Sequence, residues 1–120
     1  MNVKWLILGA SAFSLAIFAP PVRAQYPDGA EKTFCVAELR SQDRQARINL
    51  RSGPGTNHTN VGYGVPGDLV HILGSRPPEP DASKDSQGFL WYRVGFPHSG
   101  AVGWMRSDLL ARYCLYDNGD

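Results

Sequence analysis

The stretch INLRSGPGT, residues 48–56, carries the most structural information in this 120-residue chain. Ile48 and Leu50 alternate with the polar residues Asn49 and Arg51, as in a strand with one face in a core. Ser-Gly-Pro-Gly-Thr follows, in which glycine permits backbone angles that a side chain would forbid and proline stiffens the turn. The segment therefore predicts a half-buried strand that runs directly into a tight turn.

Apolar runs of strand length continue in both directions from this segment and are separated by turn residues. The chain has 13 glycines and 9 prolines, which favour short strands over long helices. The strand-like segments begin with 34–39 and end with 111–116, and 89–94 has the highest β-propensity. We therefore predict an all-β domain, a small barrel of five to six short strands, because closure of a sheet removes its exposed edges.

Two segments do not fit the strand pattern. Residues 74–88 include Pro77-Pro78-Glu79-Pro80 and have no apolar periodicity, which predicts a long loop. Residues 107–110 are predicted to form one short helical turn before the last strand.

The first 24 residues have the features of a secretory signal peptide. Lys4 precedes an apolar run from Trp5 to Ala19, and Val22-Arg23-Ala24 predicts cleavage after Ala24. The run is shorter than the roughly 18 residues of a spanning helix, which argues against the alternative of an uncleaved membrane anchor. Loss of two basic residues changes the formal charge from +1 to −1, a balance that gives no support for a nucleic-acid partner.

Cys35 and Cys114 are the only cysteines of the chain, and both follow the predicted cleavage point. An even count in an exported chain predicts one disulfide, which here would close a loop of nearly the whole domain. The alternative is a catalytic cysteine, which needs a histidine base and surroundings that favour the thiolate. Neither cysteine has a histidine nearby in the sequence.

Residues 48–56 resemble the "LNVRSGPGT" signature of the bacterial SH3 (SH3b) family. Further pieces resemble that family in the same order, namely Gly67-Asp68, Trp91-Tyr92-Arg93-Val94, Gly103-Trp104-Met105 and Leu109-Leu110. The resemblance implies an SH3-like barrel in which the first and last strands are neighbours, so that Cys35 and Cys114 can bond. Together with the signal-peptide features, it divides the chain into a signal peptide (1–24), an N-terminal linker (25–33), the SH3b-like domain (34–116) and a C-terminal tail (117–120).

The resemblance also suggests where a ligand binds. Val94 is expected to face the core as its family counterpart does, so strand alternation places Trp91 and Arg93 on the opposite face. Trp91 thus resembles the ligand-groove tryptophan of SH3 domains, unless the loop 74–88 folds over it and buries it. We predict that the ligand contacts Trp91, with Tyr63, Arg93 and Trp104 as lesser candidates.

Several other chemistries find little support in the sequence. Arg106 and Leu109 stand where eukaryotic SH3 domains have the proline and tyrosine that line a Pro-rich-peptide groove, which disfavours such ligands. The three histidines have no metal-ligand spacing, and Asp81-x-Ser83-x-Asp85 lacks the glycine and glutamate of a calcium loop. No catalytic constellation and no cofactor motif can be recognised.

These features predict an exported, secreted or periplasmic binding module that is not an enzyme. The resemblance implies recognition of a cell-wall (peptidoglycan) peptide or an envelope protein, with no cofactor and no membrane insertion after signal cleavage. The alternative is a protein–protein adaptor or inhibitor that acts through the Pro-rich loop 74–88.

Overall fold

The structure, a computed structural model, describes Tyr26 and residues 29–115. The elements are β1 (Glu31–Leu39), β2 (Ile48–Arg51), β3 (Asn60–Gly64), β4 (Leu69–Gly74), β5 (Ala82–Lys84), β6 (Leu90–Gly95), β7 (Val102–Arg106), the 3-10 turn η1 (Ser107–Leu109) and β8 (Leu110–Cys114). The all-β prediction is confirmed, although eight strands form where five to six were expected. The predicted signal peptide and the C-terminal tail lie outside the described residues.

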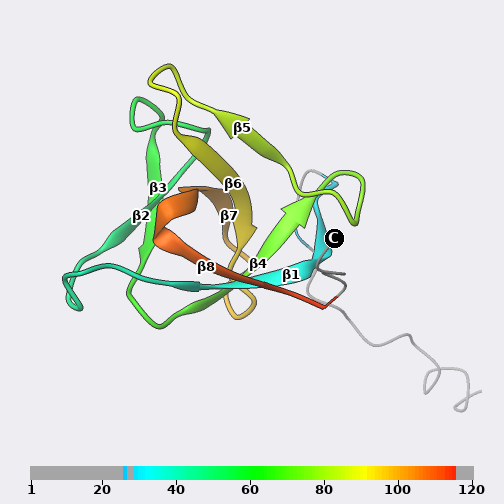
Figure 1. The fold of residues 1–120 in the computed structure, drawn as a ribbon, viewed down its shortest axis with the longest axis horizontal. Coiled ribbons are helices and arrows are strands. Elements are labelled where there is room, and N and C mark those ends of the chain that lie inside the picture. Colours follow the sequence, from blue (N-terminus) through cyan, green and yellow to red (C-terminus); the bar gives the residue numbers. More distant parts are fainter. Residues whose placement is uncertain (1–25, 27–28, 116–120) are drawn as a thin grey trace, which may run out of the picture.

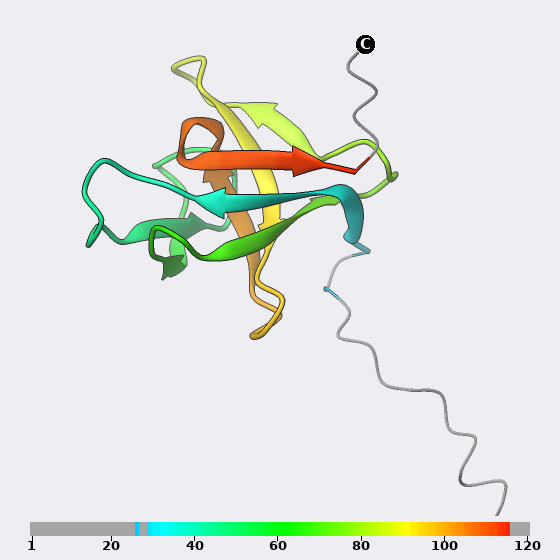
Figure 2. The ribbon, with the colours of Figure 1, turned by 60° about the horizontal axis from the view of Figure 1, so that its bottom comes forward.

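The strands pair antiparallel in one sheet, in the order β3-β2-β7-β6-β4-β1-β8, with β5 added to β6. The sheet curls around a single core, as the predicted SH3-like barrel does (Figure 1). Figure 2 shows β8 and β4 on the two sides of β1, so the first strand of the barrel lies between the last strand and the middle of the chain. β3 and β8 are the terminal strands of this order.

The core is filled by alternate residues of six strands. On β2, Ile48 and Leu50 are buried while Asn49 is exposed, as the alternation predicts. On β6, Tyr92 and Val94 are buried and Leu90 packs against them, which confirms their predicted orientation. The other members of the core cluster are Ala37, Leu39, Val70, Ile72, Met105 and Leu110. Burial of each large aliphatic side chain stabilises the fold by roughly 1.5–3 kcal/mol.

The turn that follows β2 needs its two glycines for different reasons. Gly55 has a φ of +142°, which side chains rarely adopt. At Gly53 the prediction of special backbone angles is wrong: its φ is not positive, and an added Cβ would lie 2.5 Å from Nδ1 of His58. Asn49 accepts a 3.2 Å hydrogen bond from Nδ2 of Asn60 on β3 and so links the two strands on either side of the turn.

The prediction of one long loop over 74–88 is partly wrong, because this segment contains β5. β4 and β5 lie in line along β6: Ile72 pairs with Val94, and Ala82 pairs with Tyr92. The intervening residues form a short loop whose base is closed by the backbone N–H of Asp81, which donates to the carbonyl of Leu73 at 2.9 Å. All three residues of β5 are exposed, so no apolar alternation marks this strand in the sequence.

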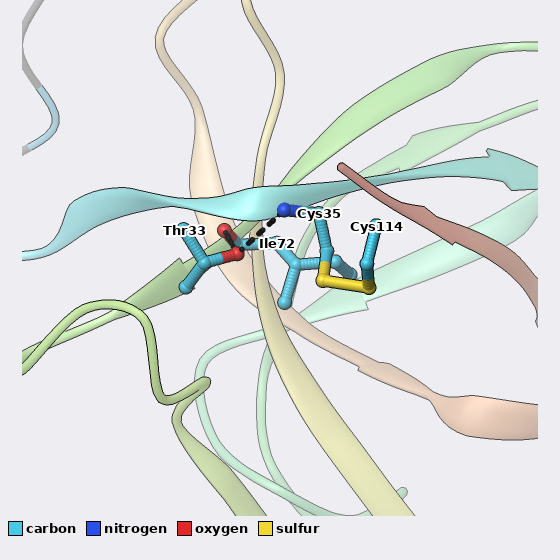
Figure 3. Close-up of a disulfide and its surroundings, with 4 residues drawn as sticks. All are labelled: Thr33, Cys35, Ile72 and Cys114. Atoms are coloured by element: carbon cyan, nitrogen blue, oxygen red, sulfur yellow. Dashed lines mark hydrogen bonds between the residues drawn. A yellow bond between two sulfur atoms is a disulfide. The ribbon is translucent and has the colours of Figure 1, made fainter. Parts of the chain in front are cut away.

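The disulfide between Cys35 and Cys114 is present and joins β1 to β8, as predicted. Thr33, also on β1, donates from its hydroxyl to the carbonyl of Ile72 at 2.8 Å and accepts from the backbone N–H of Cys35 (Figure 3). β1 is therefore bonded to β8 on one side and to β4 on the other. The strand also begins at Glu31, inside the predicted linker.

We predict that reduction of the disulfide lowers the free energy of unfolding by roughly 4 kcal/mol, because the bridge closes a loop with a sequence separation of 79. Urea titrations of the protein with and without dithiothreitol measure this difference. The double variant Cys35→Ser/Cys114→Ser is the control, because its stability should not respond to the reductant. Equal stability of the oxidised and reduced protein would contradict the prediction.

Candidate functional site

Three of the four predicted contact residues lie on one continuous outer surface of the barrel. Arg93 on β6 is directly opposite Trp104 on β7, and Trp104 is opposite Arg51 on β2. Asn49, two residues before Arg51 on β2, is opposite Tyr63 on β3. We call this surface the outer sheet face and define it by Arg47, Asn49, Arg51, Tyr63, Arg93 and Trp104.

Trp91, the leading candidate of the sequence analysis, is not an exposed side chain. Its ring points to the same side of β6 as Arg93, yet only 4% of the residue is accessible. It lies between Ser83 on β5 and Arg106 on β7, and its Nε1 donates a 2.8 Å hydrogen bond to Oδ2 of Asp85. Of the two possibilities that the sequence left open, the structure shows the covered tryptophan.

The carboxylate of Asp85 organises the turn that covers Trp91. Oδ1 accepts hydrogen bonds from the backbone N–H groups of Gln87 and Phe89, at 2.9 and 3.0 Å. Partial desolvation alone would raise the pKa of Asp85, but the hydrogen bonds from Trp91, Phe89 and Gln87 outweigh it and hold the pKa below its ordinary value. The turn after β2 also approaches this point, since a Cβ added at Gly55 would lie 3.5 Å from Cβ of Asp85.

The charged groups around Trp91 already have partners within the chain. Arg106 forms a two-pronged contact with Asp108, with donor–acceptor distances of 2.6 and 2.9 Å, and its guanidinium stacks 4.5 Å over the ring of Phe89. Arg93 pairs with Asp81 at 3.5 Å. This end of the barrel, where the resemblance places a ligand groove, is occupied by the protein's own β5 segment.

At the other end of the outer sheet face, the side chain of Tyr63 is accessible to solvent. It is 51% exposed, and the guanidinium of Arg47 lies 4.6 Å above its ring. Trp104 is half-buried between Arg93 and Arg51, and Arg51 donates from one guanidinium nitrogen to the carbonyl of His58 at 3.3 Å. A flat ring with a guanidinium stacked on it can contact both the apolar and the anionic parts of a ligand.

Arg47 and Arg51 are not among the contact residues predicted from the sequence. Residues 47, 49 and 51 alternate with the buried Ile48 and Leu50, so strand periodicity alone could have placed both arginines on the outer face. What the sequence could not show is the position of β2 between β3 and β7, which brings these arginines beside Tyr63 and Trp104.

The charges are distributed unevenly over the strands. β2, β3, β6 and β7 together carry three arginines and no acidic residue. The acidic residues of the described strands, Glu31 and Glu38, are both on β1. Because Arg93 and Arg106 are paired with Asp81 and Asp108, the positive charge that remains on the outer sheet face is that of Arg47 and Arg51.

A second surface, on the outside of β4, β1 and β8, is apolar. Val36 on β1 pairs with Tyr113 on β8, and both side chains are exposed. A hollow of about 370 Å³ lies here, lined by Lys32, Thr33, Phe34, Val36, His71, Tyr113, Cys114 and Leu115. This surface offers apolar contact area but few charged groups to orient a ligand.

Among Tyr26 and residues 29–115, no group of three or more His, Cys, Asp or Glu side chains is placed to hold a metal ion. Within the same residues, no helix combines the length and apolarity that are needed to cross a membrane.

Comparison with known proteins agrees with the fold. Residues 46–111, more than half of the chain, match the family described as Bacterial SH3 domain, and the chain belongs to this family. A similar curated protein is Serine/threonine-protein kinase D of Synechocystis sp. (strain ATCC 27184 / PCC 6803 / Kazusa), which is 40% identical over 62 residues. That match covers 52% of this chain but only 11% of the kinase, so the chain spans about a tenth of its relative. No solved structure matches the chain significantly.

We predict that Trp91→Ala lowers the free energy of unfolding by about 3–5 kcal/mol, because the indole is buried and its removal leaves a cavity. Tyr63→Ala, which truncates a half-exposed aromatic residue, is the matched control and should cost much less. Urea denaturation of the three proteins measures both effects. A loss below about 1 kcal/mol for Trp91→Ala would show that the β5 segment does not cover the ring.

We predict that acid releases Trp91 from Asp85. The folded-state pKa of Asp85 is lowered, so the carboxylate stabilises the fold above its ordinary pKa of 3.8, and this contribution disappears as the pH falls through the lower folded value. Tryptophan fluorescence and stability, followed from pH 6 to pH 2, should therefore change below about pH 4. Asp85→Asn should remove that part of the pH dependence, and an unchanged profile in this variant would contradict the assignment.

Proposed function

We propose that this chain is an exported, non-enzymatic binding module that recognises a cell-wall peptide or an envelope protein with its outer sheet face. Its family is one of binding domains, which supports a module without catalysis. The signal-peptide pattern of the first 24 residues supports export, and a disulfide is compatible with an oxidising compartment outside the cytoplasm.

The observation that carries the proposal is the exposed Tyr63 and the half-buried Trp104 on the two strands that flank β2, together with the arginines next to them. The interior of the barrel is filled by its own side chains, so a ligand has to bind on the outside. Tyrosine, tryptophan and arginine are the residues that most often dominate binding energy at interfaces. Their concentration on one side of β3, β2 and β7 favours this surface over the rest of the barrel.

Cell-wall peptides suit this surface chemically. They are short chains with both apolar side chains and carboxylates, and SH3b domains often accompany cell-wall enzymes. The outer sheet face offers rings for the former and guanidinium groups for the latter.

The alternative, an adaptor that acts through residues 74–88, has one supporting observation: residues 75–79 at the tip of this segment are all exposed. The backbone N–H of Glu79, however, donates to the carbonyl of Arg76 at 3.0 Å and closes the tip into a turn. A polyproline II ligand is extended and has no internal hydrogen bonds, so this tip does not present one. Any partner of the tip would have to recognise the turn itself.

We predict that the purified mature protein sediments with cell-wall sacculi and that Tyr63→Ala weakens this binding by roughly 10-fold or more. Tyr113→Ala removes a tyrosine from the apolar surface that is 60% exposed, against 51% for Tyr63, and should bind like the wild type. Thermal melts of both variants show whether the fold is retained. If the wild type stays in the supernatant, the cell wall is not the ligand. If Tyr63→Ala binds the sacculi normally but Glu79→Ala does not, the sacculi are bound by the 74–88 segment and not by the outer sheet face.

A further inference from the structure

We infer that the ligand of the outer sheet face carries carboxylate groups, that Arg47 and Arg51 bind them, and that Tyr63 and Trp104 contact the chain between them. This inference rests on the proposed function and specifies its ligand. It commits to one class of ligand, the carboxylate-bearing peptides of the cell wall, bound in an extended form; an acidic segment of a protein is an outcome of the test below.

The arginines of these strands differ in whether they pair with a carboxylate. Arg93 and Arg106 each pair with a carboxylate, from Asp81 and Asp108 respectively. Within the described part of the chain, the guanidinium groups of Arg47 and Arg51 have no carboxylate partner. Arg47 contacts the ring of Tyr63, and Arg51 donates to the backbone carbonyl of His58. Both therefore retain N–H donors for an external anion.

The spacing of Arg47 and Arg51 matches that of side chains on an extended peptide. Residues 47 and 51 are on the same side of the β2 segment, four residues apart, and alternate residues of a strand are about 6.7 Å apart. The two Cα atoms are thus separated by about 13 Å, the length of four residues of an extended peptide. A peptide that runs along β2 could place one acidic side chain at each arginine, with Tyr63 and Trp104 on the two flanking strands.

The side chains of Arg47 and Arg51 are already restrained before a ligand binds. The guanidinium of Arg47 is held over the ring of Tyr63, and among the described residues its N–H groups have no oxygen acceptor, so they remain available for a carboxylate. The hydrogen bond to the carbonyl of His58 restrains Arg51 in a similar way. Side chains that are already ordered lose less conformational entropy on binding, which favours affinity.

The charge around the two arginines also favours an anionic ligand. The four strands that carry the face contain no acidic residue, so nothing on them repels an anionic ligand. On the described outer sheet face, two guanidinium groups lack a carboxylate partner, and their Cα atoms are about 13 Å apart, whereas a nucleic acid presents a phosphate at each nucleotide. A peptide with spaced carboxylates matches this arrangement better than a polyphosphate does.

The test uses the intact mature protein and defined probes. The first is the peptide acetyl-Ala-Glu-Ala-Ala-Ala-Glu-Ala-amide, and its partner has both glutamates replaced by glutamine. The second pair is untreated sacculi and sacculi whose carboxylates have been amidated. The protein variants are Arg47→Gln, Arg51→Gln and Arg47→Lys, with Arg76→Gln as the control that removes the same charge from the tip of the 74–88 segment.

We expect the glutamate peptide to bind roughly 10-fold or more tightly than the glutamine peptide, and each arginine-to-glutamine change on the face to remove a similar factor. Arg47→Lys should also weaken binding, because lysine keeps the charge but cannot form the two-pronged contact. Arg76→Gln should bind like the wild type, and binding should weaken as salt is added.

Three results would overturn the inference. They are equal binding of the two peptides, binding that is unaffected by loss of Arg47 and Arg51, and stronger competition by polyphosphate than by the glutamate peptide. Failure of this inference can be distinguished from failure of the proposed function. If sacculi bind before and after amidation and the arginine variants bind normally, the cell-wall function stands and only the carboxylate assignment fails. If the glutamate peptide binds through both arginines but sacculi do not, the ligand is an acidic segment of a protein.

Discussion

The indole N–H of Trp91 donates to Oδ2 of Asp85 at 2.8 Å, and the distribution of open and closed surface on this barrel depends on that contact. The same carboxylate accepts two backbone N–H groups of its own turn, so it fixes the turn and the tryptophan together. β5 has no buried side chain and cannot be held by apolar packing. Its place on β6 therefore relies on backbone pairing and on the carboxylates at its two ends, those of Asp81 and Asp85.

This arrangement has a functional consequence. With Trp91 covered and with Arg93 and Arg106 paired to carboxylates, one end of the outer sheet face is already satisfied internally. The other end, around Tyr63, Arg47 and Arg51, keeps an exposed ring and guanidinium donors. Groups that are paired inside a protein must break those contacts to bind a ligand, whereas unpaired groups need not. The binding surface is therefore expected at the β2–β3 end.

The disulfide serves a different need of the same small domain. The core cluster contains ten buried residues, and a domain of this size buries a smaller share of its surface than a large one. A covalent bond between β1 and β8 restricts the unfolded chain and so offsets part of that deficit. It also ties the two strands that border the apolar hollow, β1 and β8, whereas the outer sheet face is carried by β2, β3, β6 and β7.

From its sequence alone, the chain could be assigned its all-β class, its core-facing residues on β2 and β6, and its disulfide. These follow from local alternation, turn chemistry and cysteine count, and the signature at 48–56 points to the family. The tertiary structure alone decided that β5 exists, that Trp91 is covered, and that Arg47 and Arg51 lie beside Tyr63 and Trp104. The reason is physical: an exposed strand leaves no apolar pattern, and contacts across strands depend on strand order, which no local stretch of sequence contains.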